Sequence, residues 1–148
     1  MSQANVQAVS RLYDAFNDGD LDYFEQQLSN DLVWNEAENS LNSDGNPYRS
    51  FAAVRDGVFA PTVRDFDRFR CDLEQLYDAG DNIIATGRYR GISTATGKEL
   101  SAQFCHIAHL DDDGKLDRIQ EYTDTLQEAQ VTGRAQQIEA IRIPQPVM

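Results

Sequence analysis

Cysteine is scarce in this chain of 148 residues, which holds only Cys71 and Cys105. Two thiols cannot build the disulfide framework that stabilises small secreted domains, so we expect a reduced, cytoplasmic protein. The N-terminal sequence MSQANVQAVS has no basic region and no apolar run, and it predicts no secretory signal. The sequence also lacks an apolar stretch long enough to span a bilayer.

Basic residues are few as well: 13 Lys and Arg stand against 25 Asp and Glu, and the net charge is -12. Nucleic acids and anionic membranes require a basic surface, so neither is an expected partner. The two histidines, His106 and His109, are three positions apart on a predicted strand and face opposite sides; neither has a zinc spacing with a cysteine. No glycine-rich phosphate loop opens a helix. The sequence therefore predicts neither a metal site nor a cofactor.

The elements that the sequence does predict are helices followed by strands. Apolar residues at helical spacing predict a first helix over 6–16. Asp20 and Ser50 are placed to cap a second and a third helix, and Asp124 a final one. Alternating patterns predict strands over 32–37, 66–77, 82–89, 98–110 and 116–123. This order indicates an α+β domain over residues 1–134 and an extended tail over 135–148.

The segment 104–124, FCHIAHLDDDGKLDRIQEYTD, predicts a hairpin with an ionisable residue on each strand. His106 shares a strand face with apolar residues, so it is either a paired core residue or part of a site. Two registers are open. A two-residue turn at Asp113-Gly114 places His106 opposite Glu121, whereas a three-residue turn with a glycine bulge places it opposite Gln120.

Four segments together resemble the nuclear transport factor 2-like superfamily, and more closely its SnoaL-like and ketosteroid-isomerase-like branch. They are FNDGDLDYF, DLVWNEAE, DGNPY and the hairpin HIAHLDDDGKLDRIQEYTD. The resemblance implies a cone-like α+β barrel, in which three N-terminal helices pack on a curved, mixed or antiparallel sheet and enclose a cavity. This fold serves isomerases, cyclases, dehydratases, epoxide hydrolases and non-catalytic binders, so it does not by itself fix the function.

The resemblance also implies roles for single residues. Glu36 matches the general base of ketosteroid isomerases, and His106 matches their protonated acid. Ketosteroid isomerases also have a tyrosine on the first helix. Its position is occupied here by Leu12, one residue before Tyr13. Glu121 matches an essential carboxylate of the limonene epoxide hydrolase branch. In ketosteroid isomerases that acid and that tyrosine donate hydrogen bonds to the developing enolate oxygen. Because the acid is changed to His106 and the tyrosine is missing, steroid isomerisation is not expected.

Glu36, His106 and Glu121 are therefore expected to point into one cavity as the catalytic set. The match requires the register that pairs His106 with Glu121, and this pairing predicts a pKa of His106 above about 6.5. No partner is predicted for Glu36. The residues expected to line the cavity are Tyr13, Trp34, Tyr48, Phe59, Phe104 and Ile119.

Two classes of function follow from this set. The first is a cofactor-independent acid–base enzyme, such as an isomerase, cyclase or dehydratase, that acts on a small, mostly apolar oxygenated molecule. The second is a non-catalytic module that binds such a molecule or serves dimerisation. A symmetric homodimer is expected through the outer sheet face, which is predicted to carry Cys105, Ile107, Tyr122 and Tyr89.

Overall fold

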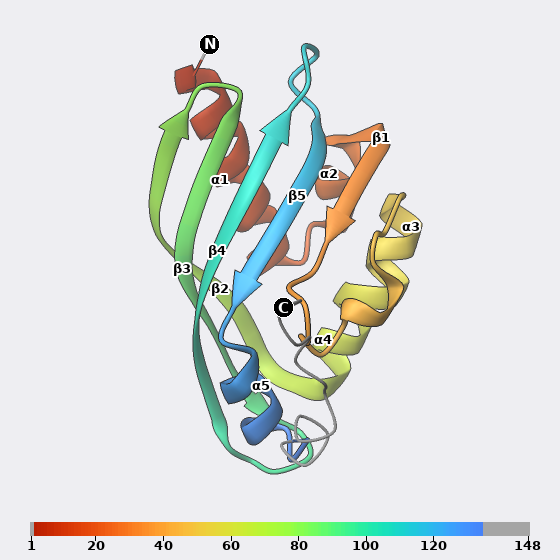
Figure 1. Ribbon diagram of the computed structural model, residues 1–148, viewed down its shortest axis with the longest axis vertical. Coiled ribbons are helices and arrows are strands. Elements are labelled where there is room, and N and C mark those ends of the chain that lie inside the picture. The colour runs from red at the N-terminus through yellow and green to blue at the C-terminus, as the bar shows by residue number, and fades with distance from the viewer. Residues whose placement is uncertain (1, 135–148) are drawn as a thin grey trace, which may run out of the picture.

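The computed structural model describes residues 2–134, so the predicted tail over 135–148 lies outside the described residues. Helices pack on one face of a five-stranded, curved and unclosed sheet (Figure 1), and the predicted α+β class is confirmed. The strand order is β1-β5-β4-β3-β2. Strand β1 runs parallel to β5, and the other neighbours are antiparallel. The strands are β1 Leu28–Asn35, β2 Phe66–Ala79, β3 Asn82–Ser93, β4 Glu99–Leu110 and β5 Leu116–Thr123.

Three N-terminal helical segments precede the meander, as predicted. They are α1 Ser2–Asp18, α2 Leu21–Gln26, and a continuous run made of α3 Phe51–Val54, a π-helical turn Arg55–Phe59 and α4 Ala60–Asp65. Helix α5, Thr125–Val131, lies at the lower end of the sheet in Figure 1. The three predicted caps are confirmed: the side chains of Asp20, Ser50 and Asp124 each accept a hydrogen bond from a backbone N–H three residues later.

The hairpin pairs His106 with Glu121, so the predicted register is confirmed. The turn is nevertheless the three-residue one, because Asp111 pairs with Lys115 and Gly114 takes the left-handed conformation at φ 78. That turn alone would shift the pairing by one residue. A β-bulge between the Leu110 and His109 pairs inserts one extra residue into β5 and restores the predicted pairing.

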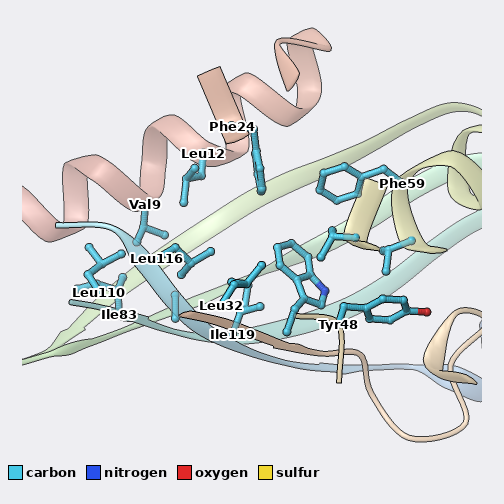
Figure 2. Close-up of a cluster of buried hydrophobic side chains, with 14 residues drawn as sticks. Val9, Leu12, Phe24, Leu32, Tyr48, Phe59, Ile83, Leu110, Leu116 and Ile119 are labelled. Carbon is cyan, nitrogen blue, oxygen red and sulfur yellow. The ribbon is translucent and has the colours of Figure 1, made fainter. Parts of the chain in front are cut away.

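Apolar side chains of the helices meet the concave face of the sheet. In Figure 2, Val9 and Leu12 of α1 and Phe24 of α2 face Leu116 and Ile119 of β5. A second apolar cluster lies toward α5; its buried members are Phe66, Cys71, Tyr89, Leu100, Ala102, Phe104 and Val131. A cavity lies between the two clusters, and its wall takes residues from both.

Strand β3 continues to Ser93, four residues beyond the predicted end at Tyr89. Gly87 and Gly91 lie in this strand, and glycine in a strand often marks a close approach of a neighbouring chain. A Cβ at Gly87 would lie 2.2 Å from the carbonyl oxygen of Asp72 and 2.7 Å from the ring of Phe104.

We expect Gly87→Ala to destabilise the fold by about 1–3 kcal/mol, because neither the backbone oxygen nor the buried ring can move freely. Gly91→Ala, on the same strand, is the matched control, since its Cβ would approach only to 3.2 Å of the Phe66 Cβ. Urea denaturation of both variants checks the order. Equal stabilities for the two variants would contradict this account of β3.

Candidate functional site

A cavity lies between α1, the concave face of the sheet and the loop that follows β1. It offers about 100 Å³ to the centres of water molecules, which is room for several of them. Most of its wall is apolar, and aromatic rings from α1, β1 and the π-helical turn contribute much of that surface. A cavity of this kind suits a mostly apolar ligand, with the few polar groups in the wall deciding its orientation.

The three residues expected to share the cavity do line it: Glu36, His106 and Glu121 are each buried, with 7% relative exposure of the residue. Tyr13, Trp34, Phe59 and Ile119 line it as well. Sequence alternation and the family match thus placed seven residues around one void.

Two residues expected in the cavity wall lie elsewhere. Phe104 sits behind the wall, stacked on His106 and Tyr89 with ring centroids 4.3 and 4.6 Å away. Tyr48 extends the sheet, since its backbone pairs with Trp34 through two hydrogen bonds of 2.8 Å. Its hydroxyl donates to the carbonyl of Asn42 at 2.6 Å, so its role is to hold the loop. Both predictions were wrong: alternation gives the face of Phe104 but not its depth behind that face, and Tyr48, expected to fold over the cavity from its loop, is held by its backbone pairing with Trp34.

A chain of hydrogen bonds connects α1 to β5 through the imidazole of His106. The Tyr13 hydroxyl lies 2.5 Å from Nδ1 of His106, and the Tyr89 hydroxyl lies 2.5 Å from Nε2. Tyr89 also donates to Oε2 of Glu121. The second oxygen of Glu121 accepts from the backbone N–H of Ala37 at 3.1 Å. Both nitrogens of His106 are therefore engaged by tyrosines.

The prediction that His106 pairs directly with Glu121, with a raised pKa, is wrong. The Tyr89 hydroxyl stands between them, and Nε2 of His106 is 3.9 Å from Oε2 of Glu121. Burial instead lowers the pKa of His106 to about 3, so the ring is neutral at physiological pH. A neutral ring has one N–H. The single hydroxyl hydrogen of Tyr89 is donated to Glu121, so towards His106 the Tyr89 oxygen must accept. The N–H of the ring is therefore on Nε2 and donates to Tyr89, while Tyr13 donates to the unprotonated Nδ1.

Glu36 directly follows β1, and its carboxyl lies near that of Glu121 on the neighbouring strand β5. The register of β1 with β5 ends with Asn35 opposite Gln120; Glu36 and Glu121 are the next residues of the two segments, and both line the same cavity. Burial, and then the charge of Glu121, raise the pKa of Glu36 well above its ordinary value. Burial also raises the pKa of Glu121, but the hydrogen bonds from Tyr89 and Ala37 oppose that increase. Within residues 2–134, the carboxyl of Glu36 accepts a hydrogen bond only from the indole N–H of Trp34, at 2.9 Å. We therefore assign the shared proton to Glu36 and the charge to Glu121.

Trp34 should report the protonation of Glu36, because it is the only tryptophan and bonds directly to that carboxyl. We expect its emission to titrate with a midpoint above 4.5, the ordinary value for glutamic acid. Glu36→Gln should abolish the transition, and exposed Glu38→Gln should leave it unchanged. A midpoint at or below 4.5, or a transition that persists in Glu36→Gln, would contradict the assignment.

Two residues of the site were missed by the sequence analysis. Tyr89 had been placed on the outer face, whereas its buried hydroxyl lies inside. A signal was available: Ile83, Ala85, Gly87 and Tyr89 form the less polar face of β3, opposite Arg88 and Arg90. The other is Glu128 on α5, which is buried and lines the cavity. An acid in a short C-terminal helix normally faces water, so no pattern pointed to it.

Among residues 2–134, no group of three or more His, Cys, Asp or Glu side chains is arranged to hold a metal ion. No helix within that range has the length and apolar character needed to cross a membrane.

The comparisons with known proteins agree with this architecture. The model of the SnoaL-like domain family matches residues 9–119, which is most of the chain, and the chain belongs to that family. A search of curated proteins gives no match. Among solved structures, an NTF2-like protein from Burkholderia thailandensis is 29% identical with a TM-score of 0.80, over 86% of this chain and 95% of the other.

Two other solved structures carry suggested activities. A SnoaL-like protein from Jannaschia, proposed as a polyketide cyclase, is 17% identical with a TM-score of 0.76, over 89% of this chain and 94% of its own. IdmH from Streptomyces antibioticus, also a proposed polyketide cyclase, is 19% identical with a TM-score of 0.73, over 87% of this chain and 98% of its own. At these identities the likeness concerns the fold, which is that of the NTF2-like superfamily.

Proposed function

We propose that this protein is a cofactor-independent acid–base catalyst of the isomerase or cyclase type, acting on a small, mostly apolar oxygenated molecule held in the cavity. The observation that carries the proposal is the pair of adjacent buried carboxyls, Glu36 and Glu121, whose different hydrogen-bond partners separate their protonation states. Two titratable groups held in opposite states are what an acid and a base at one site require.

In this mechanism the Glu121 carboxylate removes a proton from carbon next to a carbonyl group. The carboxylic acid of Glu36 hydrogen-bonds the carbonyl oxygen as negative charge develops on it, and gives up its proton there. When a further C=C bond is conjugated with it, the resulting enol is a dienol that can be reprotonated at its far carbon, which completes an isomerisation. It can instead attack a second carbonyl of the same molecule, which forms a ring. In both cases the proton on Glu121 returns to the product, and Glu36 recovers its own.

His106 has a positioning role in this scheme. Both ring nitrogens are engaged, so the ring has no N–H left for a ligand. The ring instead fixes the hydroxyl of Tyr89, and Tyr89 in turn orients the reactive oxygen of Glu121. This differs from the direct acid role that the family resemblance implied for His106.

Hydrogen–deuterium exchange of a simple ketone tests the function without knowledge of the natural substrate. The probe is 2-tetralone in D2O, followed by proton NMR. The wild-type protein should accelerate loss of the acidic methylene signals over buffer, and Glu38→Gln, an exposed acid two residues from Glu36, should do so equally. Line broadening that shows binding, without faster exchange, would overturn the proposal and favour the alternative of a non-catalytic binding module.

The outer face of the sheet supports a proposal of a symmetric homodimer. The register places Tyr122 beside Cys105, and in the adjacent row Ile84 lies between Ile107 and Tyr77. Tyr122 and Tyr77 are 55% and 52% exposed. An apolar strip of this kind is a typical interaction surface. Light scattering at tens of micromolar should give twice the chain mass of 16.7 kDa, and Ile107→Glu should give the monomer. A monomeric wild type would contradict the proposal.

A further inference from the structure

Two polar atoms near the cavity have no hydrogen-bond partner within residues 2–134. They are Oγ of Ser40 and Oε1 of Glu128; both are shielded from solvent, and both residues line the cavity. Buried polar atoms normally have partners, because leaving one unpaired costs free energy. Neither atom belongs to the Glu36–Glu121 pair or to the tyrosine–histidine chain of hydrogen bonds. The proposed acid–base chemistry therefore does not explain why these two buried atoms have no partner.

The two atoms belong to the same part of the wall. Ser40 follows a turn after β1 in which Asn39 takes a left-handed conformation with φ 67. The N–H of Leu41, the next residue, lies near enough to the Glu128 carboxyl to lower its pKa. On its other side, Glu128 accepts a long hydrogen bond of 3.4 Å from Thr123. The loop and α5 thus bring Ser40 and Glu128 to one region of the cavity, from segments almost ninety residues apart.

The titratable groups that act on Glu128 are acidic. Glu121 of β5 and Asp124 at the start of α5 both raise its pKa, and the pKa of Glu36 on the other side responds to Glu128 in turn. Asp65 also lines the cavity, but it is paired with Arg64 and Arg134. No Lys or Arg stands among the lining residues that the structure describes.

Burial and these acidic neighbours raise the pKa of Glu128 to about 8. Glu128 is consequently a carboxylic acid at neutral pH, with an O–H available for donation. Ser40 adds a hydroxyl that can donate or accept. A surrounding of acids without a lining cation repels an anion, so the matching ligand group is a neutral oxygen.

We propose that Ser40 and Glu128 form an anchoring pair that hydrogen-bonds a carbonyl or hydroxyl oxygen of the ligand. This deepens the proposed function and rests on it: the substrate class is an apolar, uncharged frame with two oxygens. One oxygen lies at the Glu36–Glu121 pair, where the proton is moved. The other lies at the anchoring pair, which sets the orientation of the carbon frame relative to Glu121.

Two probes that differ by one hydroxyl test the anchor: 2-naphthol and 2,6-dihydroxynaphthalene, titrated calorimetrically at pH 6. Wild-type protein should bind the diol about five- to tenfold more tightly, the gain from one added hydrogen bond. The double variant Ser40→Ala/Glu128→Met should lose this preference. Ser43→Ala is the matched control, because its hydroxyl is already bonded to the Ser40 carbonyl and Ser43 does not line the cavity.

A thermal melt separates anchoring from a structural role. Removing two unpartnered buried polar atoms should leave Tm at pH 8 unchanged or raise it by a few degrees. A large fall in Tm would show that Glu128 supports the fold and would overturn the anchor. A double variant that keeps the preference for the diol would also overturn it. Failure of the proposed function would appear differently, as absent tetralone exchange by the wild type while the preference for the diol remains.

Discussion

Replacing Glu121 with glutamine should slow exchange of 2-tetralone by about 10²–10⁴-fold, the usual contribution of a general base. Glutamine keeps the shape of the side chain: its carbonyl oxygen can still accept from the Ala37 N–H, and its NH2 group can donate to the Tyr89 hydroxyl, so the fold should be retained. The variant loses only the charged oxygen that takes the proton. Exchange rates under saturating tetralone, with far-ultraviolet circular dichroism as the fold check, measure this effect. Exchange by Glu121→Gln at the wild-type rate would contradict the assignment of the base.

Glu36→Gln should behave differently, because the amide of glutamine can still donate a hydrogen bond but cannot release a proton. The wild-type rate should rise with pH as the pair loses its first proton, both carboxyls having raised pKa values. It should fall again as the second proton leaves. Glu36→Gln should remove the alkaline decline, since no second proton remains to be lost. The two apparent pKa values of the rate profile belong to the pair of carboxyls and not to either residue alone. The test is therefore the comparison of the Glu36→Gln profile with the wild-type profile.

The second large effect expected is a loss of stability as pH rises. Burial raises the pKa of Glu128 from its ordinary 4.5 to about 8, so between these values the native chain holds a proton that the unfolded chain has released. The stability that Glu128 contributes is therefore fully present below about pH 4.5 and is lost as the pH rises toward 8. For one group the slope is at most about 1.4 kcal/mol for each pH unit. Glu36 and Glu121 add to the same trend, since their pKa values are also raised.

His106 acts in the opposite direction at lower pH. Its pKa falls from 6.5 to about 3, so below 6.5 the unfolded chain gains a proton that the native chain refuses. Stability contributed by this group is lost as pH falls through that window. The two effects together predict greatest stability in mildly acidic solution.

Urea denaturation between pH 5 and 8 checks this balance. Glu128→Gln should flatten the decline by up to about 1.4 kcal/mol per pH unit relative to wild type. Glu38→Gln should leave the decline as it is, because that side chain is exposed. A Glu128→Gln curve parallel to the wild-type curve would contradict a protonated Glu128 in the native state.

Local patterns in the sequence determined the elements and much of the cavity wall. Strand alternation correctly predicted that His106 and Glu121 point inward, and the family match added Glu36. The predicted helix caps are present at Asp20, Ser50 and Asp124. These features depend on neighbours in the chain or on strand parity, which a sequence records directly. The pairing of His106 with Glu121 was also predicted, although a three-residue turn and a compensating bulge produce it.

Only the tertiary structure decided which polar groups meet inside the cavity. Tyr13 reaches His106 across 93 positions of sequence, and Tyr89 separates His106 from Glu121, so a pairing predicted as direct passes through a hydroxyl. Burial then lowers the pKa of His106, where sequence reasoning expected an increase. Glu128 enters the wall because α5 docks beside the loop after β1. Desolvation and long-range contacts depend on how whole elements pack, and no local pattern of residues encodes their depth or their distances.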